Sequence, residues 1–312
     1  MKRRNFLTIA TAVALLPSPF AWATALEAYT DLMPQFWVVY DIARHQPMQA
    51  RIESLMSGFF VPNADIYAGA GVTLSADNVA NWLKNFDSLA ESVRALSLKI
   101  PETIHAQLPR FQANLRDFDI NAGRIYFLPS LFWFDGHLQP WRGIFPLFIG
   151  VDGIVQYHGT GADLTVFINH ELFHVYHAQR NPAMLLDPNP PIFVELWIEG
   201  LAVYASQLMS PSAERVHVLL DDLILAAAKP GTLTYAAAEL LKCLDSKSSK
   251  DDQRFFLTGY VGDLPARTGY LVGLTIAERI GRSMSLIAMA KLDQSAVRDL
   301  VARELVTVVQ GV

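Results

Sequence analysis

Two histidines spaced one helical turn apart constrain this chain more than any other feature. The run Asn169-His170-Glu171-Leu172-Phe173-His174 lies inside the segment 163–179, where apolar residues recur at helical spacing. His170 and His174 then share one face of a helix, so both imidazoles can reach one metal ion. Glu171 lies about 100° around the helix from His170, where its carboxylate can act on a water molecule without binding the metal. The pattern predicts a metal site.

A third ligand is expected downstream, because a catalytic zinc site usually has three protein ligands and one open position. The segment 191–208 is a second predicted helix, and it carries two carboxylates one turn apart, Glu195 and Glu199. The spacing alone leaves both open as the third ligand. The other carboxylate would accept a hydrogen bond from the N–H group of a ligand histidine.

The remaining histidines are poorer ligand candidates. His177 lies near the direction of His170 on a helical wheel, but about 10 Å further along the axis. One zinc ion with bonds near 2 Å cannot bridge that distance while it also binds His174. His177 is therefore expected at the surface or behind the ligands. His45, His105, His137 and His158 are scattered without ligand spacing, so we expect them to be structural or exposed.

Composition excludes several classes of protein. The chain has 312 residues, with 25 Lys and Arg against 30 Asp and Glu, so a mildly acidic surface disfavours nucleic acid as a partner. With 52% hydrophobic and 18% charged residues, the chain is not expected to be disordered. Its single cysteine, Cys243, excludes an internal disulfide and a cysteine-rich metal site.

The N-terminus has the order of a secretory signal peptide. Residues 1–23 contain a basic start, an apolar run over 6–16 and a small-x-small site at Ala21-Trp22-Ala23. The apolar run is too short to span a bilayer, and Arg3-Arg4 resembles the twin-arginine export signature, although ordinary Sec export stays open. We expect a periplasmic or secreted protein without a transmembrane anchor after the leader is cleaved.

The rest of the chain predicts one α+β domain that is mostly helical, with a small sheet before the metal-binding helix. Residues 24–120 have a helical pattern, and 121–312 hold the sheet and the motif helices. Short strand-like runs lie at 124–129, 131–134 and 143–150. The predicted helices that follow are 163–179, 191–208, 213–228, 235–244, 265–280 and 294–308, with Pro191 and Pro265 in first turns.

The two motif helices resemble those of the gluzincin metallopeptidases, the His-Glu-x-x-His…Glu group that includes thermolysin and the neutral aminopeptidases. The segment Trp197-Ile198-Glu199-Gly200-Leu201-Ala202 is similar to the third-ligand segment of those aminopeptidases, with one residue fewer between Trp and Glu. Exported bacterial predicted zinc-dependent proteases look closer still, because they combine Glu-Gly-Leu-Ala-x-Tyr with a later Gly-Tyr-x-x-Gly, here at 269–273. The resemblance covers residues 163–273.

The resemblance implies one Zn²⁺ per chain, held by His170, His174 and Glu199. It favours Glu199 over Glu195 because Gly and Ala follow Glu199. Twenty-four residues separate His174 from Glu199, more than in thermolysin-like enzymes, and the excess fits a loop at 181–191. Glu195 would then be the acceptor for a ligand histidine. The resemblance also implies a small thermolysin-like sheet before the metal-binding helix. The strand ending at Phe148-Ile149-Gly150 would be either its exposed edge, which could pair with an extended peptide, or a plain core strand.

The same resemblance implies a donor that stabilises the oxyanion formed during hydrolysis. The candidates are His217, Tyr260 and Tyr270, and Tyr270 is favoured because it lies in the Gly-Tyr-x-x-Gly segment. Arg267, three residues earlier, is a candidate clamp for a substrate carboxylate or carbonyl.

The function expected from these features is that of an exported zinc-dependent metallopeptidase that cleaves a peptide or protein substrate. Glu171 would act as the general base on a metal-activated water molecule. Exopeptidase action has no support, because the Gly-x-Met-Glu-Asn segment of the aminopeptidases is missing. Two alternatives stay open: a catalytically silent zinc-binding module of the cell envelope, and a zinc hydrolase that acts on a non-peptide bond.

Overall fold

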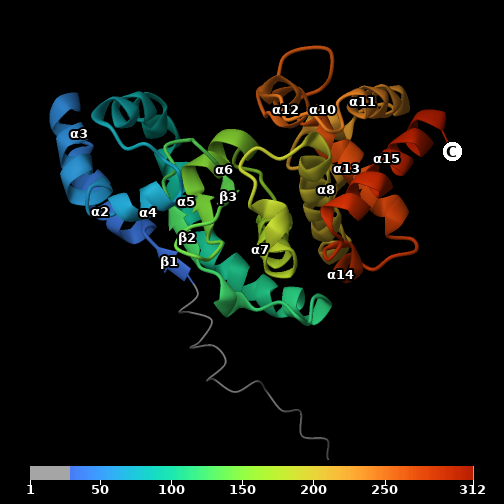
Figure 1. Cartoon of the computed structure of the whole chain (residues 1–312). Helices are drawn as coiled ribbons and strands as arrows, with labels where there is room; N and C mark the ends of the chain where they lie inside the picture. Colours follow the sequence, from blue (N-terminus) through green and yellow to red (C-terminus); the bar gives the residue numbers. More distant parts are fainter. Residues whose placement is uncertain (1–28, 312) are drawn as a thin grey trace, which may run out of the picture.

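The computed structural model describes residues 29–311, in which helices flank a small sheet (Figure 1). The predicted leader, residues 1–23, lies outside the described residues. The N-terminal helices and the sheet form one side of the molecule, and α7 (Leu164–Arg180) runs through the middle. One large cluster of buried apolar side chains extends from Leu32 to Val308, so both sides share a core. The predicted mostly helical α+β domain is confirmed.

The sheet has four strands in the order β1-β2-β4-β3. The first three in this order are parallel, and β3 pairs antiparallel with β4 at the edge. The inner strands β2 and β4 are buried on both faces, whereas β1 and β3 are half-buried. The strands are β1 (Tyr29–Asp31), β2 (Ile125–Leu128), β3 (Gly136–Leu138) and β4 (Leu147–Gly150).

The structure decides between the two interpretations of one strand, and two other expectations for the sheet are wrong. The strand that ends at Gly150 is a core strand rather than an edge, because the chain before it folds back as a hairpin and places β3 outside it. The run 131–134 is a turn rather than a strand, because Leu131 and Phe132 have φ of 59° and 60°. In addition, β1 lies in the part of the chain that was predicted to be helical.

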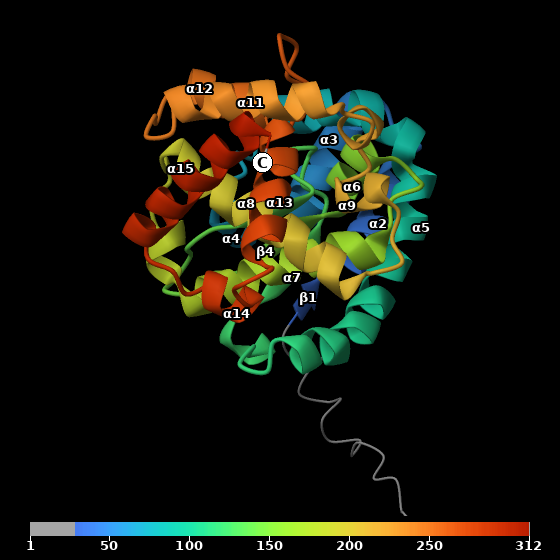
Figure 2. The ribbon, with the colours of Figure 1, turned by 90° about the vertical axis from the view of Figure 1, so that its right-hand side faces the viewer.

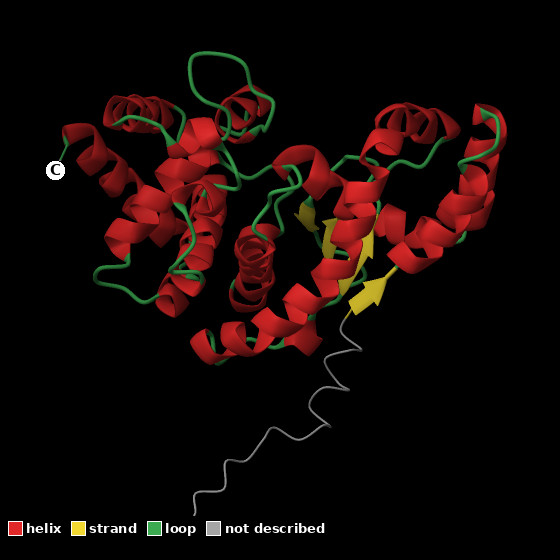
Figure 3. Cartoon of the chain, turned by 180° about the vertical axis from the view of Figure 1, so that it is seen from behind, coloured by secondary structure: helices red, strands yellow, loops and turns green. Residues whose placement is uncertain are grey.

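The helices before β2 pack an aromatic core beside the sheet. They are α2 (Met33–Ala43), α3 (Met48–Leu55), the π-helix η2 (Met56–Phe60), α4 (Ala64–Gly69) and α5 (Ala76–Asn114). Ser75 caps the start of α5, since its hydroxyl accepts a hydrogen bond from the N–H group of Asn78, and the helix continues through Pro101 and Pro109. Figure 3 shows that α5 is a long helix. It contacts the sheet through His105, which packs against Tyr29 of β1 at 5.7 Å between ring centroids.

The helices after β4 form the other side of the molecule. They are α6 (Val151–His158), α7, the 3₁₀-helix η4 (Pro182–Leu185), α8 (Ile192–Met209), α9 (Arg215–Val218), α10 (Leu223–Ala226), α11 (Pro230–Lys242), α12 (Ser249–Phe256), α13 (Thr268–Ile280), α14 (Leu286–Met289) and α15 (Gln294–Gln310), and a 3₁₀ turn (Ile120–Ala122) precedes β2. Figure 2 shows α8 and α13 at the centre of this side, with α11 and α12 across one end. The helices predicted at 163–179, 191–208, 235–244 and 294–308 are confirmed as α7, α8, α11 and α15.

Two predicted helices differ because non-glycine residues adopt left-handed backbone conformations. The segment 213–228 is not one helix, since Leu220 and Asp221, with φ of 56° and 61°, separate α9 from α10. The helix predicted from Pro265 begins at Thr268, since Arg267 has a φ of 54°. Pro265 therefore precedes α13 instead of occupying its first turn.

Among the described residues, α8 is the one helix long and apolar enough to cross a membrane. However, 67% of it is buried inside the protein, and it packs between α7 and α13. Its apolar composition is therefore explained by its place in the core.

Candidate metal centre

The α7 helix is buried over most of its length. The Asp163 carboxylate caps its start by accepting hydrogen bonds from the N–H groups of Thr165 at 2.9 Å and Val166 at 3.3 Å. Every residue from Val166 to Ala178 is buried. Packing of this core helix therefore brings the polar residues of the motif into the protein interior, where each needs a partner.

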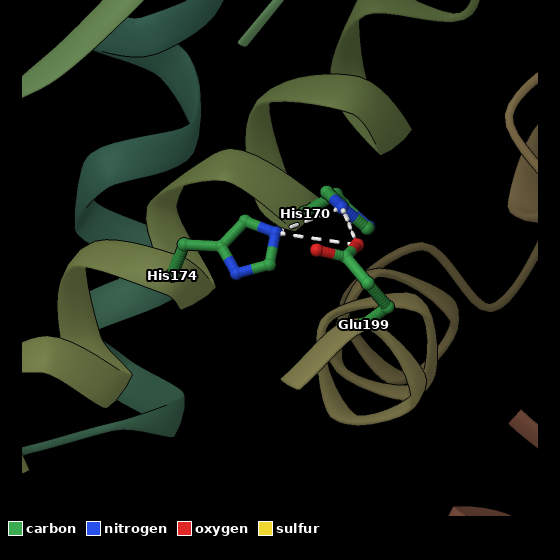
Figure 4. Close-up of side chains that lie close together, drawn as sticks. All are labelled: His170, His174 and Glu199. Carbon is green, nitrogen blue, oxygen red and sulfur yellow. Dashed lines mark hydrogen bonds and ion pairs between the residues drawn. The ribbon is translucent and has the colours of Figure 1, made fainter. Parts of the chain in front are cut away.

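The side chains of His170, His174 and Glu199 converge between α7 and α8 (Figure 4). Nε2 of His170 lies 3.0 Å from Nε2 of His174, and Oε2 of Glu199 lies 3.4 Å from the first and 3.6 Å from the second. Ligand atoms bonded to a tetrahedral zinc ion at about 2.0–2.1 Å lie about 3.3 Å apart. The three atoms match that spacing, so the cluster could hold a metal ion.

The protonation states in the cluster suit a divalent cation. Burial lowers the pKa of His174 to about 4, so this imidazole is neutral at pH 7. Burial disfavours the charge on Glu199, but its interactions with His174 and His170 outweigh burial and lower its pKa. Neutral imidazole and ionised carboxylate are the forms that bind a metal ion.

Glu171 lies outside the ligand cluster but faces the same cavity. Its carboxyl group rests against the backbone of β3, where a β-carbon added to Gly136 would lie 2.2 Å from its Cδ. Burial raises the pKa of Glu171 well above its usual value, and the charges of Asp135 and Glu199 raise it further. A carboxyl group in this environment takes up a proton readily, as a general base must.

The cluster opens into a cavity of about 510 Å³. The cavity is bounded by the residues of β3, by Phe167 one turn before His170, by the end of η4 with the loop after it, and by Tyr270. The edge strand therefore lies beside the ligand cluster, and the loop between η4 and α8 covers another side.

Two glycines bring α8 and α13 into backbone contact. A β-carbon on Gly200 would lie 2.6 Å from Cα of Gly273, and one on Gly273 would lie 2.7 Å from Cα of Gly200. Gly200 follows Glu199, and Gly273 lies one helical turn after Tyr270. The glycines of the two sequence motifs therefore allow the helices to approach closely enough to bring Tyr270 to the ligand cluster.

Tyr270 lies beside the ligand cluster. Its ring stacks on the ring of His170 at 6.4 Å between centroids, and it lines the same cavity as Glu199. Burial raises the pKa of its hydroxyl well above 10, and the charge of Glu199 adds to this shift. The hydroxyl thus stays protonated and can donate a hydrogen bond.

Glu195 lines the cavity one turn before Glu199 but does not join the two histidines. Burial raises its pKa to about 8, and the charges of Glu199 and Asp252 contribute. Among the described residues, neither His170 nor His174 has a hydrogen bond to Glu195. The geometry therefore favours Glu199 as the third ligand, and the predicted link from Glu195 to a ligand histidine is not present.

Arg267 lines the cavity, but protein groups hold its side chain. One guanidinium nitrogen donates to the carbonyl oxygen of Leu220 at 3.1 Å and lies 3.4 Å from a carboxylate oxygen of Asp222. Arg267 is 6% exposed and thus fixes the turn between α9 and α10 at the edge of the cavity. Its contact with a substrate group stays a prediction.

Of the two positions expected for His177, the surface is wrong. His177 is fully buried against Phe173, and within residues 29–311 neither of its ring nitrogens has a hydrogen-bond partner. Burial lowers its pKa to about 3, so the imidazole stays neutral. Core packing encloses α7 on all sides from Val166 to Ala178, and this stretch includes His177.

A buried charge network that no sequence pattern indicated lies beside Glu171. Nε2 of His158 lies 2.7 Å from Asp135, and Nδ1 lies 3.3 Å from Asp221. Burial opposes protonation of His158, but these two carboxylates raise its pKa to about 9. The partners are far apart in the chain and follow no motif, so no sequence signal connects them.

Comparison with known proteins adds no further constraint. No protein-family model matches the chain, and neither the curated proteins nor the solved structures that were searched contain a match. Any functional conclusion therefore depends on the residues of the cavity.

Proposed function

We propose that this protein is an exported zinc-dependent metallopeptidase. One observation carries the proposal: two imidazoles and a carboxylate have the spacing of tetrahedral ligands, beside a carboxyl group that does not ligate. A binding module needs only the ligands, whereas hydrolysis needs a base as well. Glu171 in the same cavity thus favours an enzyme over a silent zinc-binding module.

The donor set supports zinc in particular. Two histidine nitrogens and one carboxylate oxygen, with one position open, are typical of catalytic zinc sites. When bound, zinc would polarise a substrate carbonyl and lower the pKa of a water molecule. His170, His174 and Glu199 would hold the ion.

The other residues suit the remaining parts of peptide hydrolysis. Glu171 would accept a proton from the attacking water and pass it to the leaving amine. Tyr270, with its protonated hydroxyl, would donate to the oxygen that becomes negative in the transition state. Strand β3 has one free edge beside the ligands, and an extended peptide could pair with it.

Export is supported by the sequence of residues 1–23, which has a basic start, a short apolar run and a small-x-small site. The protein would act in the periplasm or outside the cell after the leader is removed. The precursor and mature masses of protein recovered from the periplasm would test this part of the proposal.

The central experiment exposes the zinc-loaded mature protein to a diverse peptide library and reads the cuts by mass spectrometry. Glu171→Gln is the inactive comparison, and Glu102→Gln, on an exposed residue of α5, is the matched control. We expect cuts with the wild type and with Glu102→Gln, but none with Glu171→Gln at the same zinc content. A zinc-loaded wild type that makes no cuts would refute the peptidase and favour the silent module or a non-peptide substrate.

A further inference from the structure

The backbone of β3 approaches the carboxyl group of Glu171 most closely at Gly136. A β-carbon on Gly136 would lie 2.2 Å from Cδ of Glu171 and 2.3 and 2.4 Å from its two carboxyl oxygens. Non-bonded heavy atoms pack at about 3.5–4.0 Å, so any side chain at this position would occupy the space of the carboxyl group. Gly136 does not have a positive φ, so the strand needs glycine here for space alone.

Neighbouring contacts hold this part of β3 in place. Gly136 pairs in register with Ile149 of β4, and the carbonyl oxygen of Asp135 accepts a hydrogen bond from the N–H group of Gly150 at 2.8 Å. One carboxyl oxygen of Asp135 accepts from the Gly136 N–H group at 2.7 Å, and the other pairs with buried His158 at 2.7 Å. The start of the strand is thus attached to β4 and to α6.

Hydrogen bonds and close packing also hold the turn before Asp135 in place. The buried carboxylate of Asp152 accepts hydrogen bonds from the N–H groups of Ser130 at 2.5 Å and Phe132 at 3.0 Å. The carbonyl oxygen of Phe134 lies so close to α6 that a β-carbon on Gly153 would be 1.9 Å from it. Because these contacts prevent β3 from moving away from Glu171, a clash at position 136 would displace the flexible end of Glu171 instead.

We infer that Gly136 is a positioning residue for Glu171, an inference that rests on the proposed function. The bare backbone of β3 determines where the carboxyl group lies beside the metal ligands. The three atoms nearest to a β-carbon at position 136 all belong to Glu171. A side chain there would therefore turn the base away while His170, His174 and Glu199 still bind zinc.

The test uses acetohydroxamate on the zinc-loaded protein, because its binding needs no peptide substrate. The hydroxamate chelates the zinc ion and gives its proton to a nearby carboxylate, so its dissociation constant depends on the position of Glu171. We expect Gly136→Ala to retain wild-type zinc content but to bind acetohydroxamate at least roughly tenfold more weakly, as Glu171→Gln does. Gly161→Ala is the matched control, because nothing lies within 4 Å of a β-carbon there.

A second variant separates the clash from general damage to the fold. Glu171→Asp withdraws the carboxyl group by one methylene, which makes room for a β-carbon at position 136. In Gly136→Ala/Glu171→Asp we expect acetohydroxamate to bind as it does to Glu171→Asp alone, because the two effects are not additive. If Gly136→Ala lowers the melting temperature, the double variant should recover it. If Gly136→Ala alone fails to fold, the double variant should fold.

Two results would overturn the inference. One is a Gly136→Ala protein that binds acetohydroxamate as tightly as Gly161→Ala does. The other is a double variant in which the losses of the two single variants multiply. A wild type that binds zinc and acetohydroxamate but cuts no peptide would instead refute the peptidase proposal, and the role of Gly136 would be judged from the binding data alone.

Discussion

Replacing Gly273 by alanine should separate α13 from α8 and weaken the site from a distance. The added β-carbon would lie 2.7 Å from Cα of Gly200, 2.7 Å from the carbonyl oxygen of Leu196 and 3.1 Å from the N atom of Gly200. All three are backbone atoms of α8, so no side chain can turn aside. Ordinary contact at about 3.5–4.0 Å requires α13 to move away by about 1 Å.

The cost follows from two opposing effects. Overpacking of a core costs about 1–3 kcal/mol, and the gain from replacing a helical glycine by alanine is at most about 1 kcal/mol. We therefore expect a net loss of about 1–2 kcal/mol and a melting temperature lower by a few degrees. Because Tyr270 lies one turn before Gly273, its side chain should also move away from the ligand cluster. The turnover number should therefore fall.

Differential scanning calorimetry and kcat on a peptide substrate, with Gly231→Ala as the control, would measure both effects. Gly231 is the second residue of α11, and nothing lies within 4 Å of a β-carbon there. The control should be at least as stable as the wild type. If Gly273→Ala matched the control in stability and turnover, the contact between the glycines would not position the site.

Three further predictions follow from the cluster and from the buried ion pairs. Glu199→Ala should weaken zinc binding at least about tenfold in chelator competition, whereas Glu195→Gln should not; the reverse would exchange their roles. Tyr270→Phe should lower kcat by about 10²–10³ with zinc affinity unchanged, and an unchanged kcat would remove it from the mechanism. Since the pKa of His158 rises to about 9 on folding, its stabilisation is complete below about pH 6.5 and is lost as the pH rises through about 9. The melting temperature should therefore fall more steeply over this range in the wild type than in His158→Gln, and parallel curves would contradict the ion pairs.

The sequence was sufficient for the parts of the site that depend on local periodicity. Helical spacing placed His170 and His174 on one face of α7, and the second motif helix placed both candidate carboxylates on α8. The choice between Glu195 and Glu199 needed the structure, because it depends on how far α8 is rotated against α7. Spacing within one helix contains no information on that rotation.

Elements set by long-range contacts or unusual backbone conformations were not predictable in this way. Leu220 and Asp221 end α9 in a left-handed conformation that sequence patterns assign to glycine or asparagine. Their conformation is held from outside the segment, by His158 and by Arg267. Strand β3 is only three residues long, and its pairing with β4 rather than its own composition defines it.

The place of the ligand cluster between α7 and α8 also bears on how the protein opens locally. The cluster joins two core helices, so a bound ion would link their amide exchange into one cooperative unit. In hydrogen–deuterium exchange, amides of α7 and α8 should then slow together on zinc binding, and those of α13 should follow through the glycine contact. Amides of α2 and α3, which pack on the far side of the sheet, should change little.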